Sequence, residues 1–350
     1  MKTAVFFLSA SCGGAERMTI TIAKLLDRSE YDVRFVVIGR EIGEIKEFIP
    51  KDYPLDLVRI RNIFDFTTLR VYRFLKKVMP QYVFCSLHYL NPRVIQAAKW
   101  AGVKKMIVRF NCTARQVTGL LKKMTIKTYP KADVVIAQTE GMKLDLLSEF
   151  NLKNEKVVVL HNLLDTKTID EKLKNVKSPY SDNDEKRVVF VGRIYKTKNI
   201  EMAIRAFIRA SSEDKKLHLY LVGKYNESDE YYQSIKQLSE ESCVHDRIHF
   251  VGFQPNPYIW MKYADCFVLS SISEGSPNVL FEALYLGVPA VSTRCTPNID
   301  EIIQDGVNGY KVDVGDYTTM GERIIDALKL NNVKSIYKHS TSMDFINLFK

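Results

Sequence analysis

Two acidic side chains, Glu274 and Glu282, flank the expected start of a helix at Asn278. The first backbone N–H groups of a helix have no partner within it and lie at the positive end of the helix dipole, so phosphate oxygens bind there readily. Glu282 lies about one turn into the helix, where its carboxylate could accept hydrogen bonds from two hydroxyls of a ribose. Glu274, in the preceding loop, could reach a hexose. Two carboxylates with this spacing could also be exposed charges at a helix edge, so the pair alone does not define a site.

Two cations follow the end of another expected strand. The apolar run 187–191 leads into Gly192 and Arg193, and Lys198 stands just before the helix expected over 200–210. Arginine offers a planar fork of donors and lysine a point charge, and together they suit a diphosphate. Two loop cations exposed to water would explain this segment equally well if it stood alone.

The elements that must position these residues follow from the pattern of the whole chain. Short apolar runs bounded by turn residues alternate with segments of helical period, which predicts parallel α/β sheets. A polar stretch at 174–186 (KNVKSPYSDNDEK) interrupts the pattern, which then restarts. The expected strands are 3–9, 33–38, 82–86, 105–109, 134–137 and 157–160 before that stretch, and 187–191, 217–222, 248–251, 266–269 and 290–293 after it.

We expect two Rossmann-like domains that face each other across a cleft. The 350 residues, 46% of them hydrophobic, exceed what a single core usually holds. Ligands of such sheets bind outside the carboxyl ends of the strands. The expected limits are 1–165 for an N-terminal domain, 166–186 for a linker, 187–332 for a C-terminal domain, and 333–350 for a segment whose helix, from Tyr337 onward, returns to pack on the first domain.

The segment 270–289 (SSISEGSPNVLFEALYLGVP) resembles the Glu-x7-Glu signature of retaining glycosyltransferases with the GT-B architecture. It is most similar to the family called GT4, which builds capsules, O-antigens and other surface glycans. The resemblance is strong over 187–310 and weaker over 40–130, where acceptor recognition usually diverges. It extends to further motifs in the family's order: Gly13-Gly14-Ala15-Glu16-Arg17, Val191-Gly192-Arg193, Lys198-Asn199, 219–223 (LYLVG), 251–253 (VGF), Ala264-Asp265, Ser292-Thr293 and 301–309 (EIIQDGVNG).

This resemblance implies that the C-terminal domain binds a nucleotide sugar, and that the N-terminal domain faces the acceptor and the membrane. Arg193 and Lys198 would bind the donor diphosphate. Glu282 would hold the ribose, and Glu274 would contact the transferred sugar. UDP is the commonest nucleotide in such enzymes, so we expect a UDP-linked donor by analogy.

The remaining donor contacts also follow from the resemblance. Gly14 would let the N-terminal loop approach the phosphates closely, because glycine has no side chain. The base would lie near Gly223 and Phe253, held partly by backbone groups. The full set of expected donor-binding residues is Gly13, Gly14, Arg193, Lys198, Gly223, Phe253, Glu274, Ser276, Asn278, Val279, Leu280 and Glu282.

Retaining transfer passes through an oxocarbenium-like state while negative charge develops on the departing diphosphate. The cations Arg193 and Lys198 and the helix N-terminus at Asn278 would stabilise that charge without a metal ion. We therefore expect a metal-independent enzyme without a cofactor. Asp182-Asn183-Asp184 matches the letters of the Asp-x-Asp metal motif of a different glycosyltransferase fold, but it lies in the polar linker, and we interpret it as solvated.

Many relatives place a histidine after the fourth N-terminal strand, facing the donor sugar, whereas this sequence has Arg109-Phe110-Asn111 there. Either Asn111 or Arg109 orients the sugar, or the leaving phosphate itself accepts the acceptor's proton. His88 could enter the cleft instead, although a structural histidine is commoner. His161, with Asn162, is expected to mark the exit from the N-terminal domain, with a backbone role. The candidate catalytic residues are therefore Glu274, Arg193, Lys198, Asn111 and His88.

The net charge of +10 is unevenly distributed. Residues 1–180 hold 31 Lys and Arg against 18 Asp and Glu, while the remainder holds 20 against 23. Residues 66–132 contain 14 Lys and Arg and no Asp or Glu, with basic side chains at helical spacing. Basic helices with an apolar side bind anionic bilayers, so we expect an anionic membrane surface as a partner. A soluble basic domain remains an alternative; nucleic acid is not expected, because no nucleic-acid motif accompanies the charge.

The remaining features concern the compartment. No run of about 20 apolar residues without charge appears, and 3–9 is interpreted as a first strand rather than a signal peptide. The six cysteines stand far apart with no Cys-x-x-Cys pair, which favours free thiols in a reducing cytosol. We expect a cytoplasmic protein, peripheral on the cytoplasmic face of the inner membrane.

The predicted function is the transfer of a hexose or N-acetylhexosamine from a UDP-linked sugar to a lipid-linked saccharide in bacterial surface-polysaccharide synthesis. One alternative is a sugar-nucleotide epimerase or a phosphorylase of the same fold, against which the setting of the two glutamates argues. Another is a non-catalytic partner that binds a UDP-sugar and supports another transferase.

Overall fold

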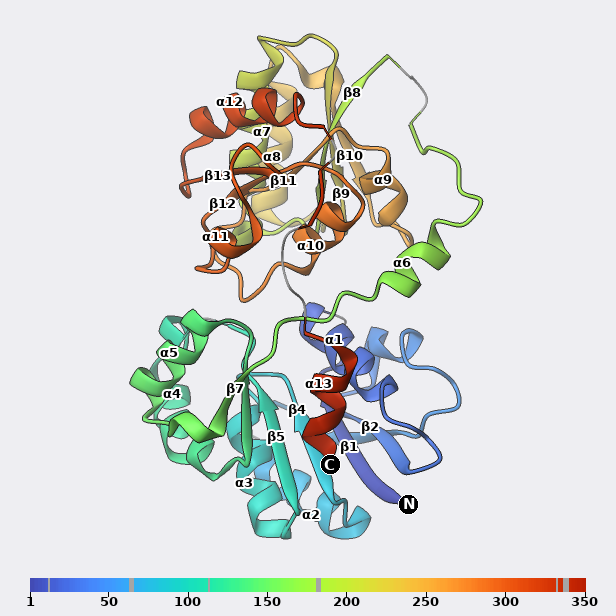
Figure 1. The fold of residues 1–350 in the computed structure, drawn as a ribbon, viewed down its shortest axis with the longest axis vertical. Coiled ribbons are helices and arrows are strands. Elements are labelled where there is room, and N and C mark those ends of the chain that lie inside the picture. Colours follow the sequence, from blue (N-terminus) through green and yellow to red (C-terminus); the bar gives the residue numbers. More distant parts are fainter. Residues whose placement is uncertain (12, 63–65, 113, 181–183, 332, 336–339) are drawn as a thin grey trace. The chain divides into compact units, whose positions relative to one another are not determined.

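The computed structural model describes residues 1–11, 13–62, 66–112, 114–180, 184–331, 333–335 and 340–350. The chain divides into two compact units (Figure 1). Unit 1 comprises Met1–Leu163 with Lys338–Lys350, and unit 2 comprises Leu164–Tyr337. In this division the expected linker, 166–186, falls within unit 2. Each unit is an α/β domain with a parallel sheet, as predicted.

Unit 1 is built on seven parallel strands in the order β3-β2-β1-β4-β5-β6-β7. The apolar run of β1 is fully buried from Ala4 to Leu8, because helices cover both faces of the sheet. The strands are β1 (Lys2–Leu8), β2 (Tyr31–Gly39), β3 (Leu55–Arg59), β4 (Tyr82–Cys85), β5 (Lys105–Arg109), β6 (Val134–Ala137) and β7 (Val157–Val159).

The helices of unit 1 bury their apolar sides against the two faces of this sheet. On one face lie Val71 and Leu75 from α2, Val94 from α3 and Leu146 from α5. On the other face lies α1, which contributes Ile22. These helices are α1 (Gly14–Lys24), α2 (Thr67–Val78), α3 (Asn91–Ala101), α4 (Gly119–Thr128) and α5 (Glu140–Phe150).

The end of the chain returns to unit 1, as predicted. Helix α13 (Ser342–Ile346) lies beside α1 in Figure 1, and a short 3₁₀ turn, Asn347–Phe349, follows it. Phe345 and Phe349 are fully buried, and the Phe349 ring lies 5.5 Å from that of Phe6, centroid to centroid. The Tyr31 hydroxyl donates to the Phe349 carbonyl at 2.8 Å. The return is therefore anchored by aromatic packing on one face of the sheet.

Unit 2 has six parallel strands in the order β10-β9-β8-β11-β12-β13. Helices α7 (Ile200–Ser211), α8 (Glu230–Glu240) and α12 (Tyr317–Ala327) cover one face, and α9 (Tyr258–Lys262) and α10 (Asn278–Tyr285) cover the other. The strands are β8 (Lys186–Val191), β9 (Leu217–Val222), β10 (Ile248–Gly252), β11 (Cys266–Leu269), β12 (Ala290–Thr293) and β13 (Gly309–Val312); the short helices are α6 (Thr166–Lys172) and α11 (Ile299–Ile302).

In each sheet the order in which successive strands are added reverses once. In unit 1, β1 lies between β2 and β4; in unit 2, β8 lies between β9 and β11. Loops that leave such a switch point diverge to opposite faces and open a crevice at the carboxyl ends of the strands. The segments after β8 and β11, which carry the predicted cations and glutamates, therefore leave neighbouring strands.

Two strands were not predicted from the sequence, and both lie at an edge of their sheet. These are β3, whose residues are mostly half-buried, and β13, which begins at Gly309. Both contain polar or small residues (LDLVR and GYKV), so neither shows the continuous apolar run that identifies a buried strand. A Cβ on Gly309 would lie 2.0 Å from the Ala290 carbonyl oxygen, and this close approach is visible only in three dimensions.

No helix within the described residues combines the length and the apolar character needed to cross a bilayer.

We expect the substitution Phe349→Ala to lower the free energy of unfolding of unit 1 by about 3–5 kcal/mol, because it leaves a cavity among closely packed rings. Urea-induced unfolding measures the loss. Met343→Ala is the matched control, since Met343 lies in α13 with 55% of its surface exposed and its removal leaves no cavity. Equal effects of the two substitutions would contradict an anchoring role for Phe349.

Candidate functional site

The loops after β8 and β11 are joined by hydrogen bonds. Strand β8 pairs with β11, with Val188 opposite Cys266 and Val189 opposite Phe267. Beyond the strand ends, the Ile272 N–H donates to the Thr197 carbonyl at 2.8 Å, and the Ser270 hydroxyl donates to the Lys198 carbonyl at 2.9 Å. Two segments about 70 residues apart are thereby held in contact.

Lys198 and Glu274 form an ion pair within this loop contact. The Lys198 Nζ lies 2.5 Å from Glu274 Oε1, and only 16% and 17% of the two side chains are exposed. The Ser271 hydroxyl donates to the same carboxylate oxygen at 2.7 Å. A shielded, hydrogen-bonded pair of this kind holds both side chains in fixed positions. The structure thus brings together two of the predicted catalytic residues.

Hydrogen bonds from the end of β12 and from the residues just after it hold the loop that carries Glu274. The Glu274 N–H donates to the Cys295 carbonyl at 3.1 Å, and the Thr293 hydroxyl donates to the Ser271 carbonyl at 2.6 Å. Burial, with a smaller contribution from the Glu274 charge, raises the pKa of the Cys295 thiol to about 12. Cys295 therefore stays a neutral thiol and acts as a packing residue.

Arg193 differs from Lys198 in its surroundings. Its side chain is exposed, and its guanidinium lies 5.6 Å from the centre of the Tyr195 ring. An exposed guanidinium over an aromatic ring keeps its donors available to a ligand. The structure places Arg193 in the same loop as Lys198 but without a bond to the Lys198–Glu274 pair among the described contacts.

Glycines allow the loops after β8, β9 and β10 to pack backbone against backbone. A Cβ on Gly223 would lie 1.8 Å from the Gly192 carbonyl oxygen, so no side chain fits there. The Gly223 N–H donates to the Gly252 carbonyl at 2.8 Å, and the Ile194 N–H donates to the Lys224 carbonyl at 2.9 Å. Phe253, predicted to lie near the base, follows Gly252 and is 60% exposed.

Helix α10 begins at Asn278, as predicted, but one of its N–H groups is not available as expected. The Leu280 N–H donates to the Pro277 carbonyl at 3.0 Å. Leu280 was expected to offer its N–H to phosphate, but in the structure this group already has a partner, because the first turn closes on Pro277. The N–H groups of Asn278 and Val279 come earlier in the chain than the Leu280 N–H that makes this bond. Glu282 is half-buried one turn further in.

Asn298 is a site neighbour that the sequence did not reveal. Its side chain is 1% exposed, and its Nδ2 lies 3.5 Å from the hydroxyl oxygen of Ser276, in the loop between the two glutamates. Its Oδ1 is buried and has no hydrogen-bond partner within the described part of the chain. Asn298 follows a different strand, β12, and no spacing in the sequence relates it to Ser276.

In unit 1, Gly13 and Gly14 form the start of α1. Gly13 is the N-cap and Gly14 the first helical residue. The buried Glu16 side chain accepts the Gly13 N–H at 3.1 Å and the Ser9 hydroxyl at 2.5 Å. Glu16 therefore organises the glycine loop, a role that was not expected from the sequence. Its position three residues after the N-cap is a capping-box spacing that could have identified it.

His88 and Asn111, two alternative catalytic candidates, are hydrogen-bonded to each other. The Asn111 Oδ1 lies 2.9 Å from His88 Nδ1 and accepts the His88 backbone N–H at 3.2 Å. Burial lowers the pKa of His88, and the hydrogen bond to Asn111 partly opposes this shift. The structure therefore keeps the imidazole neutral near pH 7 and fixes its ring.

Arg109, the third candidate in this region, is enclosed by protein. Its side chain is 2% exposed and donates to the Ser86 hydroxyl at 3.0 Å and to the Asn162 side-chain oxygen. Burial lowers the pKa of its guanidinium to about 9. Arg109 therefore links Ser86, just after β4, to Asn162. It is a packing residue rather than a group that meets a ligand. The His161 N–H, in the same segment, donates to the Ser340 hydroxyl at 2.8 Å.

The described part of the Asp-x-Asp-like stretch is paired at the surface. Asp184 forms a 2.8 Å ion pair with Lys216, and 78% of the Asp184 side chain is exposed. Asp182 and Asn183 lie outside the described residues. Among those that the structure describes, no group of three His, Cys, Asp or Glu side chains is arranged to hold a metal ion.

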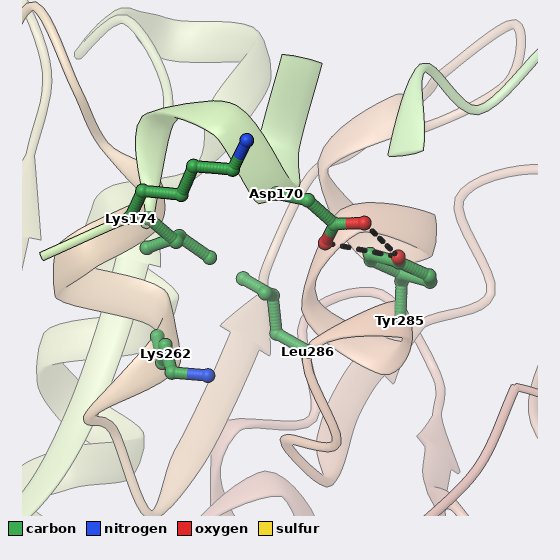
Figure 2. A pocket seen from close by; sticks show the side chains of 6 residues that line it. Asp170, Lys174, Lys262, Tyr285 and Leu286 are labelled. Atoms are coloured by element: carbon green, nitrogen blue, oxygen red, sulfur yellow. Dashed lines mark hydrogen bonds between the residues drawn. The ribbon is translucent and has the colours of Figure 1, made fainter. Parts of the chain in front are cut away.

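A hollow of about 440 Å³ lies at the other end of α10, lined by side chains from α6, the chain just after it, α9 and the end of α10 (Figure 2). The Tyr285 hydroxyl lies 3.0 Å from both carboxylate oxygens of Asp170, and dashed lines mark these two hydrogen bonds in Figure 2. Lys174 and Lys262 also line the hollow, and both are exposed. No residue predicted for the site lines it, so we do not assign it to donor binding.

Two protein-family models together match nearly the whole chain. The model described as Glycosyltransferase Family 4 matches residues 12–168, and the model described as Glycosyl transferases group 1 matches residues 171–341. The chain belongs to the GT4 family of glycosyltransferases. The first of these matches includes the glycine loop at Gly13, and the second includes the Lys198–Glu274 pair and α10.

The chain is also similar to a curated relative and to solved structures. The chain is 26% identical to the N-acetylgalactosamine-N,N'-diacetylbacillosaminyl-diphospho-undecaprenol 4-alpha-N-acetylgalactosaminyltransferase of Campylobacter jejuni, over 97% of this chain and 93% of that protein. The lipopolysaccharide outer core galactosyltransferase WaaB superposes with a TM-score of 0.75 at 17% identity, covering 100% and 99% of the two chains. Anabaena Alr3699/HepE in complex with UDP-glucose superposes with a TM-score of 0.77 at 17% identity, covering 94% and 90%. This transferase therefore has the GT-B fold.

For the loop packing of this transferase, we expect Gly223→Ala to lower the free energy of unfolding of unit 2 by more than Gly306→Ala does. Both glycines have positive φ, but a Cβ on Gly306 meets no atom within 4 Å, so only backbone strain of about 1–2 kcal/mol applies there. At Gly223 the contact with the Gly192 carbonyl adds overpacking of about 1–3 kcal/mol. Urea unfolding of both variants gives the comparison, and equal losses would contradict the close approach.

Proposed function

We propose that this transferase moves a hexose or N-acetylhexosamine, with retention of the anomeric configuration, from a UDP-linked donor to a lipid-linked saccharide in the synthesis of a bacterial surface polysaccharide. The observation that carries the proposal is the shielded Lys198–Glu274 pair beside the start of α10. It supplies a cation for a diphosphate and a carboxylate for a sugar within one loop contact.

In the proposed donor complex, Lys198 and Arg193 contact the diphosphate, and the first N–H groups of α10 face its oxygens. Glu282 accepts hydrogen bonds from the ribose hydroxyls. Glu274 accepts hydrogen bonds from the sugar, held in place by Ser271. A UDP donor is supported by the UDP-glucose bound to the Anabaena structure of the same fold.

The chemistry of the proposed reaction is electrostatic. As the anomeric C–O bond breaks, the electron pair moves to the diphosphate, and the two cations with the helix N-terminus stabilise the added charge. The sugar carries partial positive charge at that moment, and the Glu274 carboxylate stabilises it. No metal ion is required by this scheme, so we expect activity in the presence of a chelator.

The acceptor assignment rests on two observations. The name of the Campylobacter relative describes an acceptor on a diphospho-undecaprenol carrier. In unit 1, helix α3 packs against α2 and α4, and Trp100 of α3, Leu120 of α4 and Met79, just after α2, are exposed in this basic part of the chain. An apolar and basic surface of this kind suits an anionic membrane that presents a lipid-linked saccharide.

We expect Glu274→Ala to reduce sugar transfer by about 100-fold or more, because a carboxylate aimed at the developing charge is lost. UDP binding should stay within about threefold of the wild type. The assay measures release of UDP from a panel of UDP-sugars in the presence of lipid extract, and NMR of the product gives the anomeric configuration. Glu240→Ala, at an exposed position of α8, is the control.

The outcomes of this assay separate the alternatives. No transfer by the wild type with any donor would contradict the enzymatic proposal and favour a non-catalytic UDP-sugar-binding partner. An inverted product would contradict retention, and loss of activity in EDTA would contradict the metal-independent scheme.

We also expect Glu282→Ala to weaken UDP binding about tenfold, because it removes hydrogen bonds to a charged acceptor.

We expect the triple substitution Arg73→Gln, Lys123→Gln and Lys127→Gln to weaken binding to anionic liposomes by about 100-fold. All three side chains are exposed on α2 and α4. Each Lys or Arg near an anionic surface contributes about 1 kcal/mol to binding. Co-sedimentation with liposomes measures the change.

The control for the liposome experiment removes the same charge from unit 2, by Lys215→Gln, Lys262→Gln and Lys329→Gln, all at exposed positions. This variant should bind like the wild type. Equal binding of the wild type to neutral and anionic liposomes would contradict an electrostatic surface, and equal losses in both variants would contradict its location in unit 1.

A further inference from the structure

The loop that leads into α10 is held closely at Glu274 and less closely just after it. The Glu274 N–H donates to the Cys295 carbonyl at 3.1 Å, an ordinary hydrogen-bond length. Two residues further on, Asn298 Nδ2 lies 3.5 Å from the Ser276 hydroxyl oxygen, which is long for such a bond. The stretched contact therefore lies between Glu274 and the start of α10, within unit 2.

Asn298 is fixed on its own side of this contact. Its carbonyl accepts the N–H groups of Glu301 and Ile302, each at 3.1 Å, and its side chain is 1% exposed. Its Oδ1 is buried without a hydrogen-bond partner among the described residues. A buried amide with one long bond and one unpaired atom costs free energy. The stability of the fold therefore does not account for an asparagine at this position.

The Asn298 amide determines the direction in which the Ser276 hydroxyl can donate. Nδ2 is a donor only, so the Ser276 oxygen is the acceptor in this contact and its hydrogen must point away from Asn298. No other described residue bonds to this hydroxyl, and Ser276 is half-buried. Ser276 is thus left as a hydrogen-bond donor beside the start of α10.

A phosphate oxygen matches this arrangement, because it is a strong acceptor and cannot donate when ionised. When Ser276 donates to an anion, its own oxygen becomes a stronger acceptor, so the bond from Asn298 strengthens at the same time. A contact that is long in the protein alone can therefore contribute once the ligand is bound.

We propose that the Ser276 hydroxyl donates to a phosphate oxygen of the nucleotide-sugar donor, and that Asn298 is the positioning residue that orients this hydroxyl. This inference rests on the proposed function, and it adds a side-chain donor to the cations and the helix N-terminus already assigned to the diphosphate. All the groups involved belong to unit 2.

The affinity of the full chain for UDP, measured by calorimetry, tests this arrangement. We expect Ser276→Ala to weaken UDP binding about tenfold and Asn298→Leu about fivefold, because a hydrogen bond to the phosphate is lost or misdirected. The double variant should bind no more weakly than Ser276→Ala, since Asn298 acts through Ser276. Asn298→Ala, which removes the amide and adds nothing, should repeat the result of Asn298→Leu.

Urea unfolding distinguishes a positioning role from a structural one. Asn298→Leu should unfold at the same urea concentration as the wild type or at a higher one, because it removes an unpaired buried oxygen. The matched control is Asn308→Leu. Asn308 is buried at the start of β13, and its side chain bonds to the Gln304 N–H at 2.8 Å and to the Ile302 carbonyl at 2.9 Å. The control should unfold at lower urea and bind UDP like the wild type.

Each outcome decides between the two proposals. If the wild type transfers sugar from a UDP donor and Asn298→Leu binds UDP equally well, the role of Asn298 is overturned and the proposed function stands. Losses that multiply in the double variant, or a lower unfolding midpoint for Asn298→Leu with unchanged UDP binding, would also overturn it. Absence of both UDP binding and transfer in the wild type would overturn the proposed function and this inference together.

Discussion

The pairing of β8 with β11 is the constraint on which the contact between Lys198 and Glu274 in this transferase depends. These strands are 75 residues or more apart in sequence, yet they are adjacent in the sheet, so their loops leave the same edge. The hydrogen bonds from Ile272 and Ser270 to the Thr197–Lys198 segment then hold the two loops together. Without this pairing, Lys198 would be a solvated lysine and Glu274 a solvated carboxylate.

Shielding gives the Lys198–Glu274 contact its character. An ion pair at the surface contributes little, because water screens both charges. Here about five-sixths of each side chain is covered, and Ser271 and the Cys295 carbonyl add hydrogen bonds to the Glu274 side chain and backbone. The carboxylate is therefore held in one position by the protein itself, so a ligand that binds it need not order it. The Arg193 side chain, by contrast, is exposed.

In unit 1, too, the pairing of two strands brings side chains from separate segments into contact. The register of β4 and β5 sets Ser86 opposite Arg109 and His88 opposite Asn111, and both pairs are hydrogen-bonded. Arg109 is sealed inside and Asn111 is not. A search along the sequence offers Arg109, Asn111 and His88 as rival candidates. In the structure they are in different surroundings: His88 and Asn111 are hydrogen-bonded to each other, and the buried Arg109 donates to Asn162.

The sequence by itself determined the two α/β halves, the central strands, the start of α10 at Asn278, the return of the C-terminal segment and membership of the GT4 family. These follow from apolar runs and local motifs, which depend on neighbours along the chain. The tertiary structure decided the edge strands β3 and β13, the position of Asn298 beside Ser276, the capture of the Leu280 N–H by Pro277, and the bond between His88 and Asn111. Each of these depends on which strands become neighbours or on how a turn closes, and no spacing in the sequence records that.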